Sequence, residues 1–278
     1  MLKKRYDTVK VILFATAFFA CAMFILWRVN AAVHLRTQTI VFTTLALGYL
    51  VVSRSISITI GRNAEVVEQP MDYPPDGIDP IQSGCVIDGI INNRDITAAF
   101  FYMAQKGYFT IREYERKQFV FEYIQSPKYE HKAMIALFNA IFGDGREKAV
   151  KLTECADRIK EALPKVKKNS IKSISSKKNK EIANITGKVQ GFKNRLISNR
   201  GEHAEALIAA DPEYVYKVFP YAYSFSVTAK LARNFDFDNI DPPTWYVPYG
   251  VDEDYKFDVV VYNSIVKNLL EQLNKEVF

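Results

Sequence analysis

The residues best suited to metal binding or redox chemistry are few and widely spaced in this sequence. They are His34, His131, His203, Cys21, Cys85 and Cys155. No two of them have the close spacing of a zinc site, and the cysteines show no disulfide framework. The sequence therefore predicts no metal site and no cofactor, and it favours a reducing compartment.

The sequence also lacks a recognisable catalytic centre. It has no serine in a nucleophile elbow and no phosphate-binding glycine loop. The glycine-aspartate-glycine stretch at 143–145 lacks the ligand series of a calcium loop and predicts a turn. The acidic run at 252–254 precedes a predicted helix, where carboxylates suit the helix dipole. We therefore expect no catalytic residues and a protein that is not an enzyme; the alternative is an enzyme whose catalytic residues are dispersed.

A predicted helix that begins at Asp95 carries the first candidate contact surface. A helix that reads DNA bases presents arginine, lysine, asparagine or glutamine on its exposed face. Here basic residues occur only at Arg94 and Lys106, and the face itself is formed by Thr97, Ala98, Phe101, Tyr102 and Gln105. Phe101, Tyr102 and Gln105 therefore predict a protein-contact face, or a face buried against the second half of the domain.

The second candidate surface is strongly basic. Residues 165–200 hold eleven lysines and arginines against the single acid Glu181, which predicts a basic, serine-rich link or an exposed helix. Most such runs are solvated tethers; the best functional use is contact with anionic lipid, and nucleic acid is second. The candidate contacts are Lys165, Lys167, Lys168, Lys172, Lys177, Lys178 and Lys180, joined for nucleic acid by Arg112, Arg116 and Lys117.

The elements before this stretch predict a winged-helix-like module. Asp79 and Pro80 suit the start of a short helix, and the apolar spacing after Asp95 predicts a second helix that Gly107 caps. Alternation at 108–113 and 118–123 predicts a hairpin, which would be the wing.

Further helices are predicted towards the C-terminus. They comprise 130–142, a segment from Thr153 that Pro164 ends, and a terminal helix at 255–277. Asp211 and Pro212 suit the start of another helix, and 241–249 predicts a loop rich in proline and aromatic residues.

Two uncharged runs near the N-terminus predict a membrane anchor. They are 11–27 and 37–53, each bracketed by basic residues. A helix of 17 residues is about 25 Å long, and snorkelling flanks can extend it to the roughly 30 Å hydrocarbon core. Basic residues before the first run and after the second favour a cytoplasmic location for both ends of this hairpin. We therefore expect a multi-pass protein of the cell membrane with the N-terminus and the C-terminal domain in the cytoplasm. The alternatives are a cleaved signal peptide at 1–32 and a buried helix pair.

Four stretches in order give this sequence a resemblance to a known family. They are Pro74 to Pro80, Asp95 to Glu113, Val218 to Phe235 and Pro243 to Tyr246. In this order they resemble the C-terminal region of the YciQ-like predicted membrane proteins, a prokaryotic family of unknown function. The resemblance implies a short variant without the family's outer domain. Ser226 stands where the family usually has glycine, and Leu231 where it usually has tryptophan.

We therefore expect a membrane-anchored α+β protein. Its expected parts are a transmembrane hairpin (1–62), a proline-rich connector (63–77), a winged-helix-like module (78–127), a helical extension (128–164), a basic linker (165–200) and a mostly α-helical C-terminal part (201–278). The favoured function is protein interaction or regulation at the membrane, with the lipid bilayer and an unidentified protein as partners. The alternative is a membrane-tethered nucleic-acid-binding protein.

Overall fold

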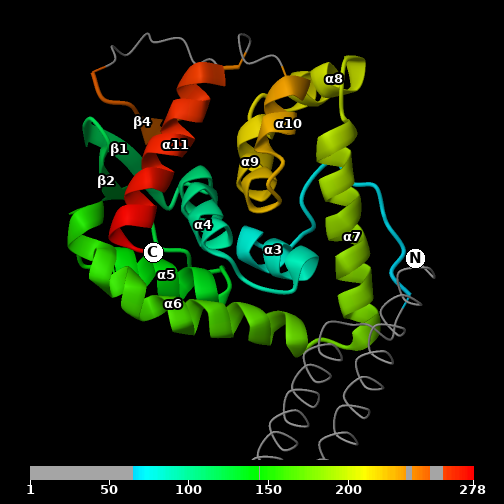
Figure 1. Ribbon diagram of the computed structural model, residues 1–278, viewed down its shortest axis with the longest axis horizontal. Helices are drawn as coiled ribbons and strands as arrows, with labels where there is room; N and C mark the ends of the chain where they lie inside the picture. Colours follow the sequence, from blue (N-terminus) through cyan, green and yellow to red (C-terminus); the bar gives the residue numbers. More distant parts are fainter. Residues whose placement is uncertain (1–64, 144, 236–239, 251–258) are drawn as a thin grey trace, which may run out of the picture. The chain divides into compact units, whose positions relative to one another are not determined.

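The computed structural model describes residues 65–143, 145–235, 240–250 and 259–278, all within one compact unit (Figure 1). The side chains of α11 are described from residue 267. The helices in these ranges are α3 (Pro80–Asp88), α4 (Asn93–Gln105), α5 (Lys132–Phe142), α6 (Leu152–Ser175), α7 (Asn179–Ser198), α8 (Glu202–Ala210), α9 (Tyr214–Ser224), α10 (Thr228–Asn234) and α11 (Val259–Glu276). The strands are β1 (Phe109–Glu115), β2 (Gln118–Tyr123), β3 (Ala149–Lys151) and β4 (Tyr246–Val247).

The predicted start of the first helix is confirmed. The side chain of Asp79 accepts a hydrogen bond from the main-chain N–H of Gln82, and the Gln82 side chain accepts one from the main-chain N–H of Asp79, which completes a capping box. Pro80 occupies the first turn, and Gly89 ends the helix at φ +80°. The second helix begins at Asn93, two residues before the predicted start, because Asn92 is the N-cap and Asp95 supplies the reciprocal carboxylate.

The predicted hairpin is also confirmed, and it forms the centre of a four-stranded sheet. The strand order is β3-β2-β1-β4, with β1 and β2 antiparallel. The outer strand β4 pairs in parallel with β1, and Ile111 lies opposite Tyr246. A segment more than 130 residues away in the sequence therefore completes the edge of the sheet beside the hairpin.

Helix α4 is buried on two sides, and it joins the predicted winged-helix-like module and the predicted C-terminal part in one core (Figure 1). Phe100 packs against Phe121 of the sheet, with ring centroids 5.6 Å apart. On another side Phe101 packs edge-on against Phe219 of α9 at 5.0 Å. The residues predicted as a winged helix thus share a continuous hydrophobic core with the C-terminal part.

The prediction that Pro164 ends a helix is wrong. Helix α6 continues through Pro164 to Ser175, and α7 follows after a short turn, so the predicted basic linker is mainly helical. The reason is packing: Val166, Ser170 and Ile174 are buried at helical spacing on one face of α6. That face stabilises the helix although proline removes one internal hydrogen bond.

The connector after residue 64 docks on α7. The main-chain N–H of Gln69 donates to the carbonyl of Gly187 at 3.1 Å, and its side chain donates to Asn184 at 2.7 Å. A Cβ atom at Gly187 would lie 2.0 Å from the carbonyl oxygen of Val67, and one at Gly191 would lie 1.8 Å from that of Gln69. Glycine at both positions lets the two backbones approach closely.

The predicted membrane-anchored fold class and multi-pass localisation are contradicted. Among the described residues, no helix is both long enough and apolar enough to cross a membrane. Helix α6 has the length, with 24 residues, but its exposed face carries charged side chains such as Lys165 and Lys168. The two uncharged runs at 11–27 and 37–53 lie outside the described residues.

Candidate functional site

The predicted contact face of α4 divides into a buried and a half-buried part. Phe101 is fully buried and Tyr102 is 9% exposed, with its hydroxyl donating to Glu130 at 3.1 Å. Both face α9, which is the burial that the sequence left open as an alternative. Gln105, one turn further along α4, is only half-buried and lines a hollow.

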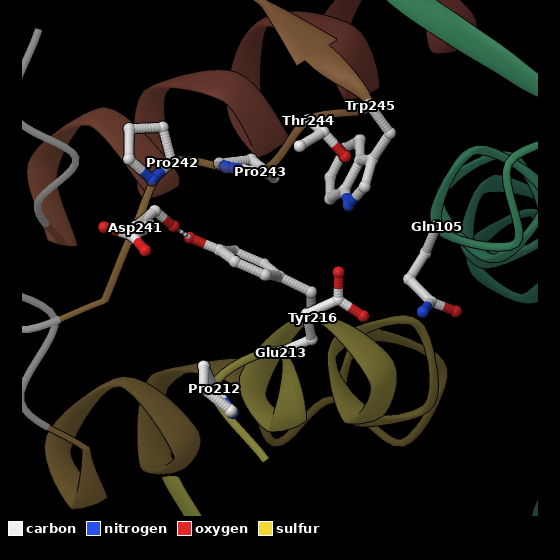
Figure 2. A pocket seen from close by; sticks show the side chains of 9 residues that line it. All are labelled: Gln105, Pro212, Glu213, Tyr216, Asp241, Pro242, Pro243, Thr244 and Trp245. Carbon is white, nitrogen blue, oxygen red and sulfur yellow. Dashed lines mark hydrogen bonds between the residues drawn. The ribbon is translucent and has the colours of Figure 1, made fainter. Parts of the chain in front are cut away.

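This hollow lies where α4, α9 and the loop before β4 meet (Figure 2). Its volume is about 190 Å³. The lining residues are Gln105, Pro212, Glu213, Tyr216, Asp241, Pro242, Pro243, Thr244 and Trp245. We call it the Trp245 hollow.

Sheet pairing fixes the position of Trp245. Its carbonyl accepts a hydrogen bond from the main-chain N–H of Ile111 in β1 at 2.8 Å, and Tyr246 follows as the first residue of β4. The hydroxyl of Tyr216 donates to the carbonyl of Asp241 at 2.6 Å, which ties the proline loop to α9. Three prolines restrict the backbone of the walls further, so the hollow is held from several sides.

The indole nitrogen of Trp245 is the one buried polar atom of the hollow that lacks a partner among the described residues. Trp245 is 8% exposed, and its ring meets Tyr216 edge-on at 6.2 Å and Phe101 at 6.2 Å. Figure 2 shows the nitrogen facing the hollow, on the side towards the carboxylate of Glu213. Because an indole N–H only donates, the hollow presents an unused donor.

The charged groups around the hollow are mainly acidic. Glu213 and Asp241 line it, and none of the described lining residues is basic. The nearby Lys217 is held by both oxygens of Asp211 at 2.8 Å and only loosely by Glu213 at 3.6 Å. These carboxylates raise the pKa of Lys217, and the hydrogen bond that Lys217 donates to Asp211 contributes most. The carboxylate of Glu213 can therefore accept further hydrogen bonds.

The predicted basic contacts gather on the last turns of α6 and the start of α7. Lys177 is half-buried and pairs with Glu181. The other six have no carboxylate partner in the described residues, and five of these are exposed; they are Lys165, Lys168, Lys172, Lys178 and Lys180, with Lys167 half-buried. Three hairpin residues, Arg112, Arg116 and Lys117, were predicted to join these lysines in binding nucleic acid. Two of them already have a carboxylate partner, because Arg112 pairs with Glu122 at 2.8 Å and Lys117 with Glu271 at 2.7 Å.

Two buried cysteines are among the ionisable groups of the described residues that lie away from the hollow. Burial raises the pKa of the Cys85 thiol to about 11 and that of the Cys155 thiol to about 12, so neither is a reactive thiolate. No group of three or more histidine, cysteine, aspartate or glutamate side chains in the described ranges could hold a metal ion.

Comparisons with known proteins add no relative. No protein-family model, curated protein or solved structure matches this chain. The resemblance to the YciQ-like proteins therefore stays a prediction, and the function must be argued from the chain's own residues.

Sequence reasoning identified Gln105 but missed its partners Glu213, Tyr216 and Trp245. The local signals were the proline-aromatic run at 241–249, which predicted a loop without a role, and the stretch Pro243 to Tyr246, which contributed to the family resemblance. Trp245 and Gln105 lie 140 positions apart, and their proximity depends on the parallel pairing of β4 with β1.

Proposed function

We propose that this protein binds a short segment of a partner protein in the Trp245 hollow. The observation that carries the proposal is the buried indole N–H of Trp245, which has no partner in the described residues. A buried donor without a partner costs about 1–3 kcal/mol. A peptide carbonyl that accepts from this N–H would recover that energy on binding.

The size of the hollow favours a peptide side chain over a cofactor. Pockets for small molecules usually measure about 300–1,000 Å³, whereas this one measures about 190 Å³. One or two residues of an extended segment fit such a space. The walls of Tyr216, Trp245 and prolines resemble the aromatic surfaces that hold extended peptides in other interaction domains.

The test uses the fluorescence of Trp245 in the full-length chain. The sequence has two tryptophans, so the substitution Trp27→Phe leaves Trp245 as the sole indole. Peptides selected on this protein from a random phage-displayed library should change the emission of Trp245. Replacing Trp245 by phenylalanine keeps an aromatic wall and removes the donor together with the pyrrole part of the indole ring.

We expect the selected peptides to bind the Trp245→Phe variant about tenfold more weakly, which corresponds to about 1.4 kcal/mol. Fluorescence polarisation of labelled peptides measures this loss, with Tyr129→Phe, a fully exposed site far along the chain, as the matched control. Equal affinity for the wild-type and Trp245→Phe proteins would refute the proposal.

Nucleic-acid binding is the second candidate function. It is favoured by the six lysines of α6 and α7 that have no carboxylate partner in the described residues. Lysines act as point charges that contact phosphates without reading bases, so binding should be independent of sequence.

The measurement for this candidate is the affinity of the full-length protein for a 20-base-pair duplex between about 50 and 200 mM salt. Replacing Lys165, Lys168 and Lys172 by glutamine should reduce the slope of log K against log salt by up to about 3. The control neutralises Lys128, Lys132 and Lys230, which are also exposed. An identical slope in both triple variants would eliminate this candidate.

A further inference from the structure

We infer that the Trp245 hollow selects a segment that carries an arginine side chain. This inference rests on the proposed function and adds the chemistry of the ligand. It is carried by three features that converge in Figure 2: an unused indole donor, flat aromatic and proline walls, and carboxylates without a cation among the lining residues.

The charge around the hollow favours a cationic ligand. Among the described lining residues, the side chains that carry a charge at neutral pH are Glu213 and Asp241, and both are acidic. Lys217, which lies 3.6 Å from Glu213, is already held by Asp211 at 2.8 Å. An anionic ligand would therefore be repelled, whereas a cation would gain a carboxylate that is not fully neutralised.

The shape of the aromatic walls favours a planar cation. The rings of Tyr216 and Trp245 stand at 87° to each other with centroids 6.2 Å apart. A planar guanidinium stacks on aromatic faces and presents five donors in its plane, so it can lie along one ring while its edge reaches Glu213. A lysine ammonium has the charge but lacks the plane.

The unused indole donor favours a ligand that also carries a hydrogen-bond acceptor. The ligand must also supply an acceptor to the indole N–H of Trp245, which burial keeps from water. A free guanidinium or an amine has no acceptor, because such cations only donate. An arginine within a peptide supplies both groups, the cation from its side chain and the acceptor from a main-chain carbonyl.

The experiment compares two peptides that differ at one side chain, which is a charged guanidinium in one and a neutral urea with a carbonyl oxygen in the other. In the Trp27→Phe protein, the emission of Trp245 is titrated with Ac-Pro-Arg-Pro-NH2 and with the same peptide in which neutral citrulline replaces arginine. Citrulline keeps the planar shape and the main-chain carbonyls. We expect the citrulline peptide to bind about tenfold more weakly, and its lysine counterpart to lie between the two.

A charge-removing variant locates the effect. Glu213→Gln should weaken binding of the arginine peptide about two- to fivefold at low salt. It should leave the citrulline peptide unchanged. Glu205→Gln is the matched control, because Glu205 is an exposed carboxylate on α8 that does not line the hollow.

The outcomes separate this inference from the proposed function. If library peptides require the Trp245 N–H but arginine and citrulline peptides bind equally, the hollow binds peptides and the selection for arginine is refuted. If no library peptide distinguishes wild type from Trp245→Phe, the proposed function fails, and the inference fails with it.

Discussion

The hydroxyl of Tyr246 donates a hydrogen bond to the carboxylate oxygen Oε2 of Glu113 at 3.1 Å. The other oxygen of Glu113 accepts from the main-chain N–H of Lys117 at 2.6 Å, in the hairpin turn. One buried carboxylate thus links β4 to the hairpin. Because β4 has only two residues, this link helps to hold Trp245, the residue before Tyr246, at the edge of the hollow.

Removal of the Tyr246 hydroxyl should loosen Trp245. We expect Tyr246→Phe to lower the free energy of unfolding by about 1 kcal/mol, and to make Trp245 more accessible to acrylamide quenching in the Trp27→Phe background. The control is Tyr114→Phe, which removes the exposed bond from Tyr114 to Gln118 without touching β4. Quenching that rises equally in both variants would contradict the role given to Glu113.

Truncation of Phe101 distinguishes a core residue from a contact residue. Its side chain is fully buried against Phe219, Tyr223 and Trp245. We expect Phe101→Ala to lower the free energy of unfolding, measured in urea, by about 3–5 kcal/mol. Ile124→Ala, at a side chain that is 52% exposed, should cost well under 1 kcal/mol. A near-neutral Phe101→Ala would mean that this face of α4 is not packed against α9.

A methyl group on Gly187 should displace the connector from α7. The added Cβ would lie 2.0 Å from a main-chain oxygen of Val67, which cannot be relieved by moving a side chain. We expect Gly187→Ala to cost about 1–3 kcal/mol and to speed proteolysis between residues 65 and 72. Asn194→Ala, an exposed change on the same helix, is the control. Unchanged proteolysis in Gly187→Ala would show that the connector does not depend on this close approach.

The buried carboxyl of Asp79 should make stability depend on pH. Burial, together with the negative charge of Glu130, raises its pKa from 3.8 to about 7, although the N–H of Gln82 opposes the shift. Oδ2 of Asp79 lies 3.7 Å from Nδ1 of His131, whose pKa burial lowers, so the histidine does not supply a compensating charge near neutral pH.

The direction in which stability changes with pH follows from the two pKa values of Asp79. Because folding favours the protonated form of Asp79, the stability that this carboxyl contributes to the folded protein is fully present below about pH 4 and is lost as the pH rises to about 7. We expect Asp79→Asn, which retains a capping side chain, to remove this loss, which is on the order of 4 kcal/mol. Urea unfolding of both proteins from pH 4 to 8 measures it. His131 is present in both proteins. If their free energies of unfolding changed with pH in parallel, Asp79 would be excluded as the cause of the pH dependence.

The sequence by itself determined the local elements of the described region. Asp79 with Pro80 specified the start of α3, and alternation specified the hairpin of β1 and β2, because caps and strand periodicity depend on neighbouring residues. It also located the basic surface, since lysines between 165 and 180 remain exposed whether that stretch is a linker or a helix.

Only the tertiary structure decided what those elements do. Pro164 was expected to end a helix, but the buried face of Val166 and Ile174 carries α6 past it. Phe101 could have faced a partner or a core, and α9, more than 110 residues later, covers it. Trp245 and Gln105 meet because β4 adds to the edge of β1. Periodicity reports which side chains share a face, whereas the neighbour that covers a face is set by long-range packing.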